Sequence, residues 1–246
     1  MSASDRVSGI AVLVLALTGC ADNLAVHTPP ETPTMGTDRA TVTGRVVDVN
    51  GVAVAGAAVA ARLTGEHATA DASGAFSMDV PANTTLTLAV TAPNMAPTLL
   101  AQFLVSPGAS ANFQVPLLTT DHLKGLVAMG SNAMGGAIAV SLRSMSGGAT
   151  NTAGTTIELT PSNLGKVLYA PPSAGLADPD PRMTAFMPGS DPVAWALGVQ
   201  PHVSIMKLSL HGATQVQPPY AIDEVEWPGT FTVDAGALTQ VTLFTK

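Results

Sequence analysis

Charged and aromatic side chains are both scarce in this sequence. Charged residues make up 11% of the 246 residues and aromatic residues 4%, whereas hydrophobic residues make up 46%. A helical protein needs many Glu, Lys and Arg side chains on its solvent-facing sides, so the composition argues against a helical fold. Val, Thr and Gly are frequent instead, which is typical of strands and tight turns. The composition therefore predicts an all-β protein.

Basic residues are few and scattered. The chain has 10 Lys and Arg residues against 17 Asp and Glu residues, which gives a net charge of −7. Nucleic-acid binding and electrostatic binding to an anionic membrane both need clustered basic side chains. The sequence contains no such cluster. We therefore expect neither a nucleic-acid partner nor a polybasic membrane contact.

Cys20 is the only cysteine in the chain, which excludes an internal disulfide and a cysteine-based zinc site. Cys20 lies at the end of an N-terminal segment in which an apolar run, residues 10–18, follows Arg6. That run is shorter than the ~20 residues needed to span a bilayer, so it predicts the apolar region of a signal peptide. The segment ends in Leu17-Thr18-Gly19-Cys20. These residues resemble the lipobox of bacterial lipoproteins, which implies that residues 1–19 are removed and that Cys20 carries the lipid.

A lipid on Cys20 would place the chain in the cell envelope, because several acyl chains on one residue give durable anchoring. In Gram-negative lipoproteins an Asp directly after the cysteine favours the inner membrane. Ala21 stands there instead, so we expect the outer membrane. The alternative is a plain secretory signal or a buried N-terminal strand. Residues 20–39 include three prolines among polar residues and are expected to form an extended linker.

Residues 41–118 have the pattern of a β-sandwich. Phe76, Met78 and Val80 alternate with polar residues, which places them on one face of a strand. Asn50-Gly51 between two apolar segments is the strongest short hairpin signal. About seven such short segments follow one another, at the spacing found in sandwich folds.

Two groups of residues in this region are characteristic of a known family. They are Gly44-Arg45-Val46-Val47-Asp48 with Val54-Ala55-Gly56-Ala57, and Asp71-Ala72-Ser73-Gly74-Ala75-Phe76 with Val80-Pro81 and Ala92-Pro93-Asn94. They resemble the carboxypeptidase regulatory-like domain. The resemblance implies a transthyretin-like sandwich over residues 40–119 that serves as a non-catalytic accessory module. Asn83 stands where the family often has Gly, and because Asn tolerates left-handed backbone angles we expect the turn to be kept.

Residues 120–246 are expected to form a second β-sandwich. Three of its segments follow the order of segments in the first half: 154–159 parallel 56–61, 195–199 parallel 76–80, and 241–243 parallel 113–117. The second half is therefore either a diverged repeat of the first or an unrelated β domain. The predicted fold class is all-β, with tandem transthyretin-like or Ig-like sandwiches after a signal peptide and a flexible linker.

No motif in the sequence indicates catalysis. The Gly-x-Ser-x-Gly turn of many serine hydrolases is absent, and the 5 histidines are too scattered for a metal site. Asp178 and Asp180 offer carboxylates that a calcium ion could use, but the proline after each favours a stiff loop. We therefore expect no enzyme activity, no catalytic residue, no metal and no cofactor.

Tyr220 and Trp227 flank three acidic residues in a segment bounded by prolines, residues 217–228. Aromatic side chains in loops are frequent anchors for protein partners. The alternative is that the two rings cap the open end of a sandwich. Together these features predict a lipid-anchored, non-enzymatic structural or protein-interaction module with an envelope protein as partner. A carbohydrate- or peptide-binding lipoprotein that uses loops of the second domain is the alternative function.

Overall fold

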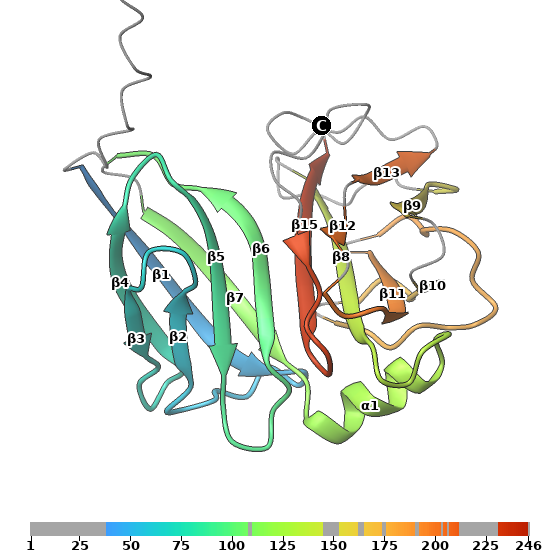
Figure 1. Cartoon of the computed structure of the whole chain (residues 1–246), viewed down its shortest axis with the longest axis horizontal. Helices are drawn as coiled ribbons and strands as arrows, with labels where there is room; N and C mark the ends of the chain where they lie inside the picture. Colours follow the sequence, from blue (N-terminus) through green and yellow to red (C-terminus); the bar gives the residue numbers. More distant parts are fainter. Residues whose placement is uncertain are drawn as a thin grey trace, which may run out of the picture. The chain divides into compact units, whose positions relative to one another are not determined.

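The structure of this chain is a computed structural model. It describes residues 38–107, 110–144, 153–161, 165–173, 176–189, 192–202, 204–205, 207–211 and 231–245. Within these ranges the chain forms fifteen strands and one short helix, which confirms the predicted all-β fold (Figure 1). No helix in the described ranges is long and apolar enough to cross a membrane. Residues 35–246 belong to one compact unit.

Seven strands form the sandwich of the first half. They are β1 (Arg39–Asp48), β2 (Ala58–Ala61), β3 (His67–Thr69), β4 (Ala75–Pro81), β5 (Thr85–Thr91), β6 (Thr98–Leu104) and β7 (Ser110–Leu117). One layer has the order β4-β1-β7, and β6, β5, β2 and β3 follow one another in the other layer (Figure 1). The central strand β1 pairs antiparallel with β4 and parallel with β7.

Period-two alternation along the strands builds the core of this sandwich. Phe76, Met78 and Val80 of β4 are buried, while Ser77 and Asp79 between them are exposed. Side chains from both layers fill the space between the sheets in the same way. The predicted assignment of β4 is therefore confirmed, together with its inward face.

The turns form where the sequence predicts them. Gly51 has φ 78°, which a residue with a side chain rarely adopts, and the Asp48 carboxylate accepts hydrogen bonds from the backbone N–H groups of Asn50 and Val52, both at 2.8 Å. Asn83 has φ 56°, so Asn supplies the left-handed conformation at the position where the related family often has Gly.

The second half contains one helix and eight strands within the described ranges. They are α1 (Thr120–Ala128), β8 (Gly136–Ser144), β9 (Thr156–Thr160), β10 (Lys166–Tyr169), β11 (Val193–Val199), β12 (Ser204–Ile205), β13 (Lys207–His211), β14 (Phe231–Thr232) and β15 (Leu238–Thr245). Trp195 at the centre of β11 is fully buried.

The helix α1 was not predicted. Thr119 caps its first turn by accepting a hydrogen bond from the backbone N–H of His122 at 3.2 Å. Leu123, Leu126 and Val127 are buried on one face of the helix. A capping Thr followed by apolar residues at helical spacing is the signal that would have located it.

Strand pairing in the second half repeats that of the first. Strand β8 pairs antiparallel with β11 and parallel with β15, as β1 does with β4 and β7. Strand β9 pairs antiparallel with β13, as β2 does with β5. The three pairs of segments matched from the sequence lie in corresponding strands: 154–159 and 56–61 in β9 and β2, 195–199 and 76–80 in β11 and β4, and 241–243 and 113–117 in β15 and β7. A common origin of the two halves stays a prediction.

One sheet runs through both halves. Its order is β10-β11-β8-β15-β6-β5-β2-β3, and the two halves meet where β15 pairs in parallel with β6. The Gln240 side chain also donates a hydrogen bond to the Pro116 carbonyl at 2.7 Å. The predicted boundary near Thr119 thus lies between two segments that share a sheet.

Candidate functional site

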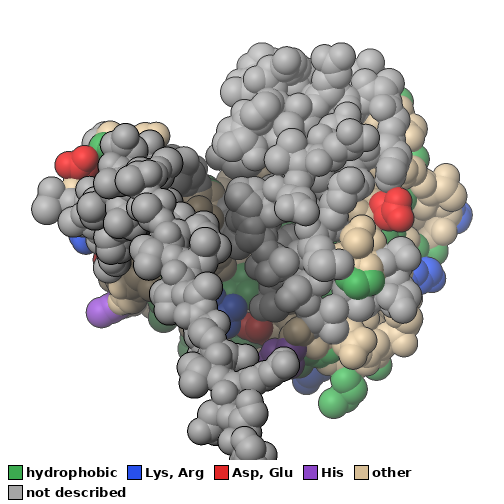
Figure 2. Space-filling model, turned by 45° about the horizontal axis from the view of Figure 1, so that its top comes forward, with side chains coloured by type: hydrophobic (Ala, Val, Ile, Leu, Met, Phe, Trp, Pro, Cys, Tyr) green, Lys and Arg blue, Asp and Glu red, His purple; other side chains and the backbone are tan. Residues whose placement is uncertain are grey.

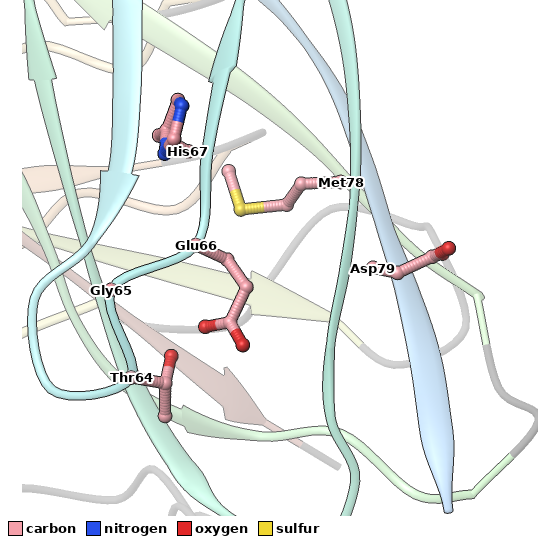
Figure 3. Close-up of a pocket in the computed structure, with 6 residues that line it drawn as sticks. All are labelled: Thr64, Gly65, Glu66, His67, Met78 and Asp79. Carbon is pink, nitrogen blue, oxygen red and sulfur yellow. The ribbon is translucent and has the colours of Figure 1, made fainter.

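A groove lies between the edges of the two layers of the first sandwich. Strand β3 ends the eight-stranded sheet and β4 ends the three-stranded sheet, and the groove opens between these two edges. Its volume is about 370 Å³, and it is lined by Thr64, Gly65, Glu66, His67, Met78 and Asp79 (Figure 3). We call it the β3–β4 groove.

Glu66 is the carboxylate that faces this groove. Its side chain is 21% exposed, and its Oε1 lies 3.5 Å from Nη1 of Arg39. The hydroxyl of Thr64 points towards the Glu66 carboxylate (Figure 3). Neither Thr64 Oγ1 nor Glu66 Oε2 has a hydrogen-bond partner of ordinary geometry.

Glu66 is ionised at neutral pH. Burial raises the pKa of Glu66, but the Thr64 hydroxyl, the Glu66 backbone amide and the Arg39 guanidinium together outweigh it, so the pKa lies below the usual 4.5. The groove thus holds a negative charge that is partly withdrawn from water.

Arg39 and Asp79 border the groove on the β4 side. Arg39 donates a hydrogen bond from Nη2 to the backbone carbonyl of Asp79 at 2.7 Å. The Asp79 carboxylate accepts a hydrogen bond from the Thr41 hydroxyl at 2.9 Å and points away from Glu66 (Figure 3). The Met78 side chain reaches from β4 towards β3 and is almost fully buried, with 6% of its surface exposed (Figure 3).

A second groove borders α1. Its volume is about 260 Å³, and it is lined by Thr120, Leu123, Lys124, Val127, Ala133, Met134, Gly135, Ala235 and Gly236. Met134 on its rim is 81% exposed. Apart from Lys124 the lining carries no charged side chain, so this groove suits an apolar side chain rather than an ionic group.

Charged side chains do not gather into one patch on the face shown in Figure 2. Among the described residues visible there, basic and acidic groups are few, and neither sign covers a continuous area. This distribution agrees with the scattered basic residues of the sequence.

The residues predicted to contact a membrane or a partner lie outside the described residues. They are Cys20, Tyr220 and Trp227. Their roles in lipid attachment and partner contact stay predictions. Trp195, the other tryptophan, is in the core and is hydrogen-bonded from Nε1 to the Ala177 carbonyl at 2.9 Å.

Asp178 and Asp180 do not form a shared cation site. Asp178 lies 2.7 Å from His122 Nε2, and Asp180 binds Arg182 at 2.7 Å. Hydrogen bonds from the Arg182 side chain and backbone lower the pKa of Asp180 to about 2. Among the described residues, no group of three or more His, Cys, Asp or Glu side chains is placed to hold a metal ion.

The β3–β4 groove was not predicted from the sequence. Glu66 and His67 sit in a polar stretch that reads as an ordinary turn. They line a groove only because β3 and β4 lie close together. That closeness depends on how the two sheets stack, and sheet stacking produces no local pattern in the sequence.

Comparison with known proteins identifies one domain. Residues 41–118 match the carboxypeptidase regulatory-like domain family, and this confirms the resemblance drawn from the sequence. No curated protein sequence matches the chain.

Solved structures with partial similarity come from several bacteria. A type II cohesin–X-dockerin complex from Acetivibrio cellulolyticus matches 33% of this chain at 22% identity and a TM-score of 0.29, and this chain spans 59% of that one. The Bacillus anthracis TIE protein matches 85% at 12% identity and a TM-score of 0.27, over 34% of its own length. A shaft pilin from Lactobacillus rhamnosus GG matches 86% at 8% identity and a TM-score of 0.24, over 98% of its length.

Proposed function

We propose that this chain, in which residues 41–118 form a carboxypeptidase regulatory-like domain, is a lipid-anchored envelope protein that acts as a non-enzymatic interaction module. The domain match carries the proposal, because the resemblance implies an accessory module rather than a catalytic one. The sequence supports the envelope location through its apolar leader and its single cysteine at the end of a lipobox-like segment.

The anchor in this proposal is a thioether-linked lipid on Cys20. A palmitate analogue fed to cells that express the chain should label the wild type, while Cys20→Ala should stay unlabelled and leave the membrane fraction. Equal labelling of the two proteins contradicts the anchor. Cell fractionation then separates the expected outer membrane from the inner membrane.

The partner in this proposal is another envelope protein. Crosslinking in intact envelopes, followed by purification of the lipidated chain, should recover one protein in constant ratio across preparations. Cys20→Ala should lose that partner, since it removes the chain from the membrane. Recovery of the chain alone, with specific binding of the same chain to a glycan array, would instead favour the carbohydrate-binding function.

Tyr220 and Trp227 are proposed contacts for that partner. In Trp195→Phe protein the fluorescence reports on Trp227 alone. Red-shifted emission that quenchers reduce, and that shifts to the blue when the partner is added, supports the contact. Blue-shifted emission that resists quenching in the free protein supports the alternative, in which the rings cap the sandwich.

A further inference from the structure

Met134 is the most exposed large hydrophobic side chain in the described ranges. It is 81% exposed, although apolar side chains of this size are usually covered. Methionine differs from the other exposed apolar residues, Val52 and Leu63, because its thioether sulfur reacts with oxidants. Exposure and chemical reactivity therefore coincide at Met134.

Hydrogen bonds of the backbone hold Met134 in this exposed position. The Met134 N–H donates to Asn132 Oδ1 at 3.0 Å, and the Gly135 N–H donates to the Asn132 carbonyl at 3.0 Å. The Gly236 N–H donates to the Gly135 carbonyl at 3.1 Å, which fastens this loop to the loop before β15. The thioether is therefore accessible in the folded protein, without any local opening of the chain.

Other methionines of the described chain are less accessible. Met187 is 49% exposed, Met129 is 36% exposed, and Met78 in the core of the first sandwich is 6% exposed. Of these four side chains, Met134 alone lines the groove beside α1, which we call the α1 groove. A chemical change at its sulfur therefore changes the surface of that groove.

We propose that Met134 is a site of reversible oxidation by peroxides and that its sulfoxide makes the rim of the α1 groove polar. With hydrogen peroxide, the sulfur attacks one peroxide oxygen and the O–O bond breaks. That oxygen passes its proton to the leaving hydroxide and stays on sulfur, so the products are a sulfoxide and water. Methionine sulfoxide reductases reverse the change with a dithiol, which becomes a disulfide while the oxygen leaves as water.

The sulfoxide alters the α1 groove because it is a polar group, whereas a thioether is apolar and only a weak acceptor. The floor of the groove, Leu123 and Val127, is buried and is not itself modified. The change is therefore confined to the rim. This inference goes beyond the proposed function, since it concerns the chemistry of this chain and depends neither on a partner nor on the lipidation of Cys20.

Peptide mapping by mass spectrometry tests the assignment. The complete folded chain is exposed briefly to hydrogen peroxide, and the sulfoxide fraction is followed over time at each methionine. Met134 should react at least about tenfold faster than Met78, in line with their exposed fractions of 81% and 6%, and Met187 and Met129 should lie between them. A rate at Met134 no higher than that of Met78, or faster oxidation of Met129 or Met187, overturns the assignment.

Backbone amide shifts measured by NMR test the effect on the groove. Oxidation should shift the amides of Leu123, Lys124 and Gly236, and a methionine sulfoxide reductase with its dithiol should restore them. Met134→Leu is the matched control, because leucine keeps the volume and apolar character but cannot be oxidised. Peroxide should leave these amides unshifted in the variant, although Met129 is still present there. Equal shifts in the variant, or no shifts in the wild type, overturn the effect on the groove.

Discussion

The Arg62 guanidinium lies 2.7 Å from the Asp234 carboxylate and ties the turn after β2 to the loop before β15. The two residues belong to different halves of the chain, and the β6–β15 pairing joins the same halves through backbone hydrogen bonds. Exposed ion pairs contribute little by themselves, and both of these side chains are more than 30% exposed. The sheet pairing, with its buried residues, is therefore the main connection, and the ion pair is an addition to it.

Two buried threonines at this connection should respond in opposite ways to replacement by valine. Thr239 of β15 is 1% exposed and its hydroxyl has no hydrogen-bond partner, whereas the Thr98 hydroxyl of β6 donates to the Ala96 carbonyl at 3.3 Å. Thr239→Val removes an unsatisfied group and should raise the free energy of unfolding by about 1 kcal/mol. Thr98→Val removes a hydrogen bond and should lower it by about 1 kcal/mol. Urea denaturation measures both, and a loss of stability in Thr239→Val would show that its hydroxyl is satisfied.

Gly44 should not tolerate a methyl group. A Cβ at this position in β1 would lie 2.6 Å from the Phe113 carbonyl oxygen and 2.6 Å from the Phe76 ring, and the carbonyl is fixed in the β1–β7 pairing. We expect Gly44→Ala to lower the free energy of unfolding by about 3 kcal/mol or more, since overpacking strains both sheets.

Gly125 on α1 is the control for this substitution. Nothing lies within 4 Å of a Cβ built there, and the residue is exposed on a helix. Gly125→Ala should raise the free energy of unfolding by about 0.5–1 kcal/mol through helix propensity. Similar effects of the two Gly→Ala changes would contradict the close packing of β1 against Phe76.

Asp180 should titrate abnormally because of Arg182. Hydrogen bonds from Arg182 lower the pKa of Asp180 to about 2 from the usual 3.8. A depressed pKa in the folded state means that this pair stabilises the fold above pH 3.8 and that its contribution is lost as the pH falls towards 2. Arg182→Ala should return the pKa of Asp180 towards 3.8, as followed by carboxyl carbon NMR. An unchanged pKa in the variant would assign the shift to other groups.

The sequence predicts the strands of this protein better than it predicts how they come together. Alternation at Phe76, Met78 and Val80 is a local signal of period two, and the turn at Asn50-Gly51 has its own chemistry, so both were located correctly. The short helix α1 was missed because composition favoured strands throughout. The β6–β15 pairing brings together segments from opposite ends of the chain, and parallel neighbours leave no mark on either strand alone.

The functional residues also differ in whether the sequence alone can identify them. Glu66 is an unremarkable residue of a polar turn until β4 places Met78 opposite it. Cys20, by contrast, stands out through its leader and its lipobox-like neighbours, although its lipidation remains to be measured. Residues that act through their local sequence can be found from the sequence, whereas those that act through sheet stacking cannot.

The β6–β15 pairing is the central feature of this fold, because it joins the two halves into one folded unit. Equilibrium urea unfolding of Trp227→Phe protein tests this with two probes: fluorescence of Trp195, which is fully buried in the second half, and hydrogen exchange of β1 and β4 peptides in the first half. We predict one cooperative transition with the same midpoint for both probes. Two separated midpoints would contradict the shared sheet and would make the halves independent domains.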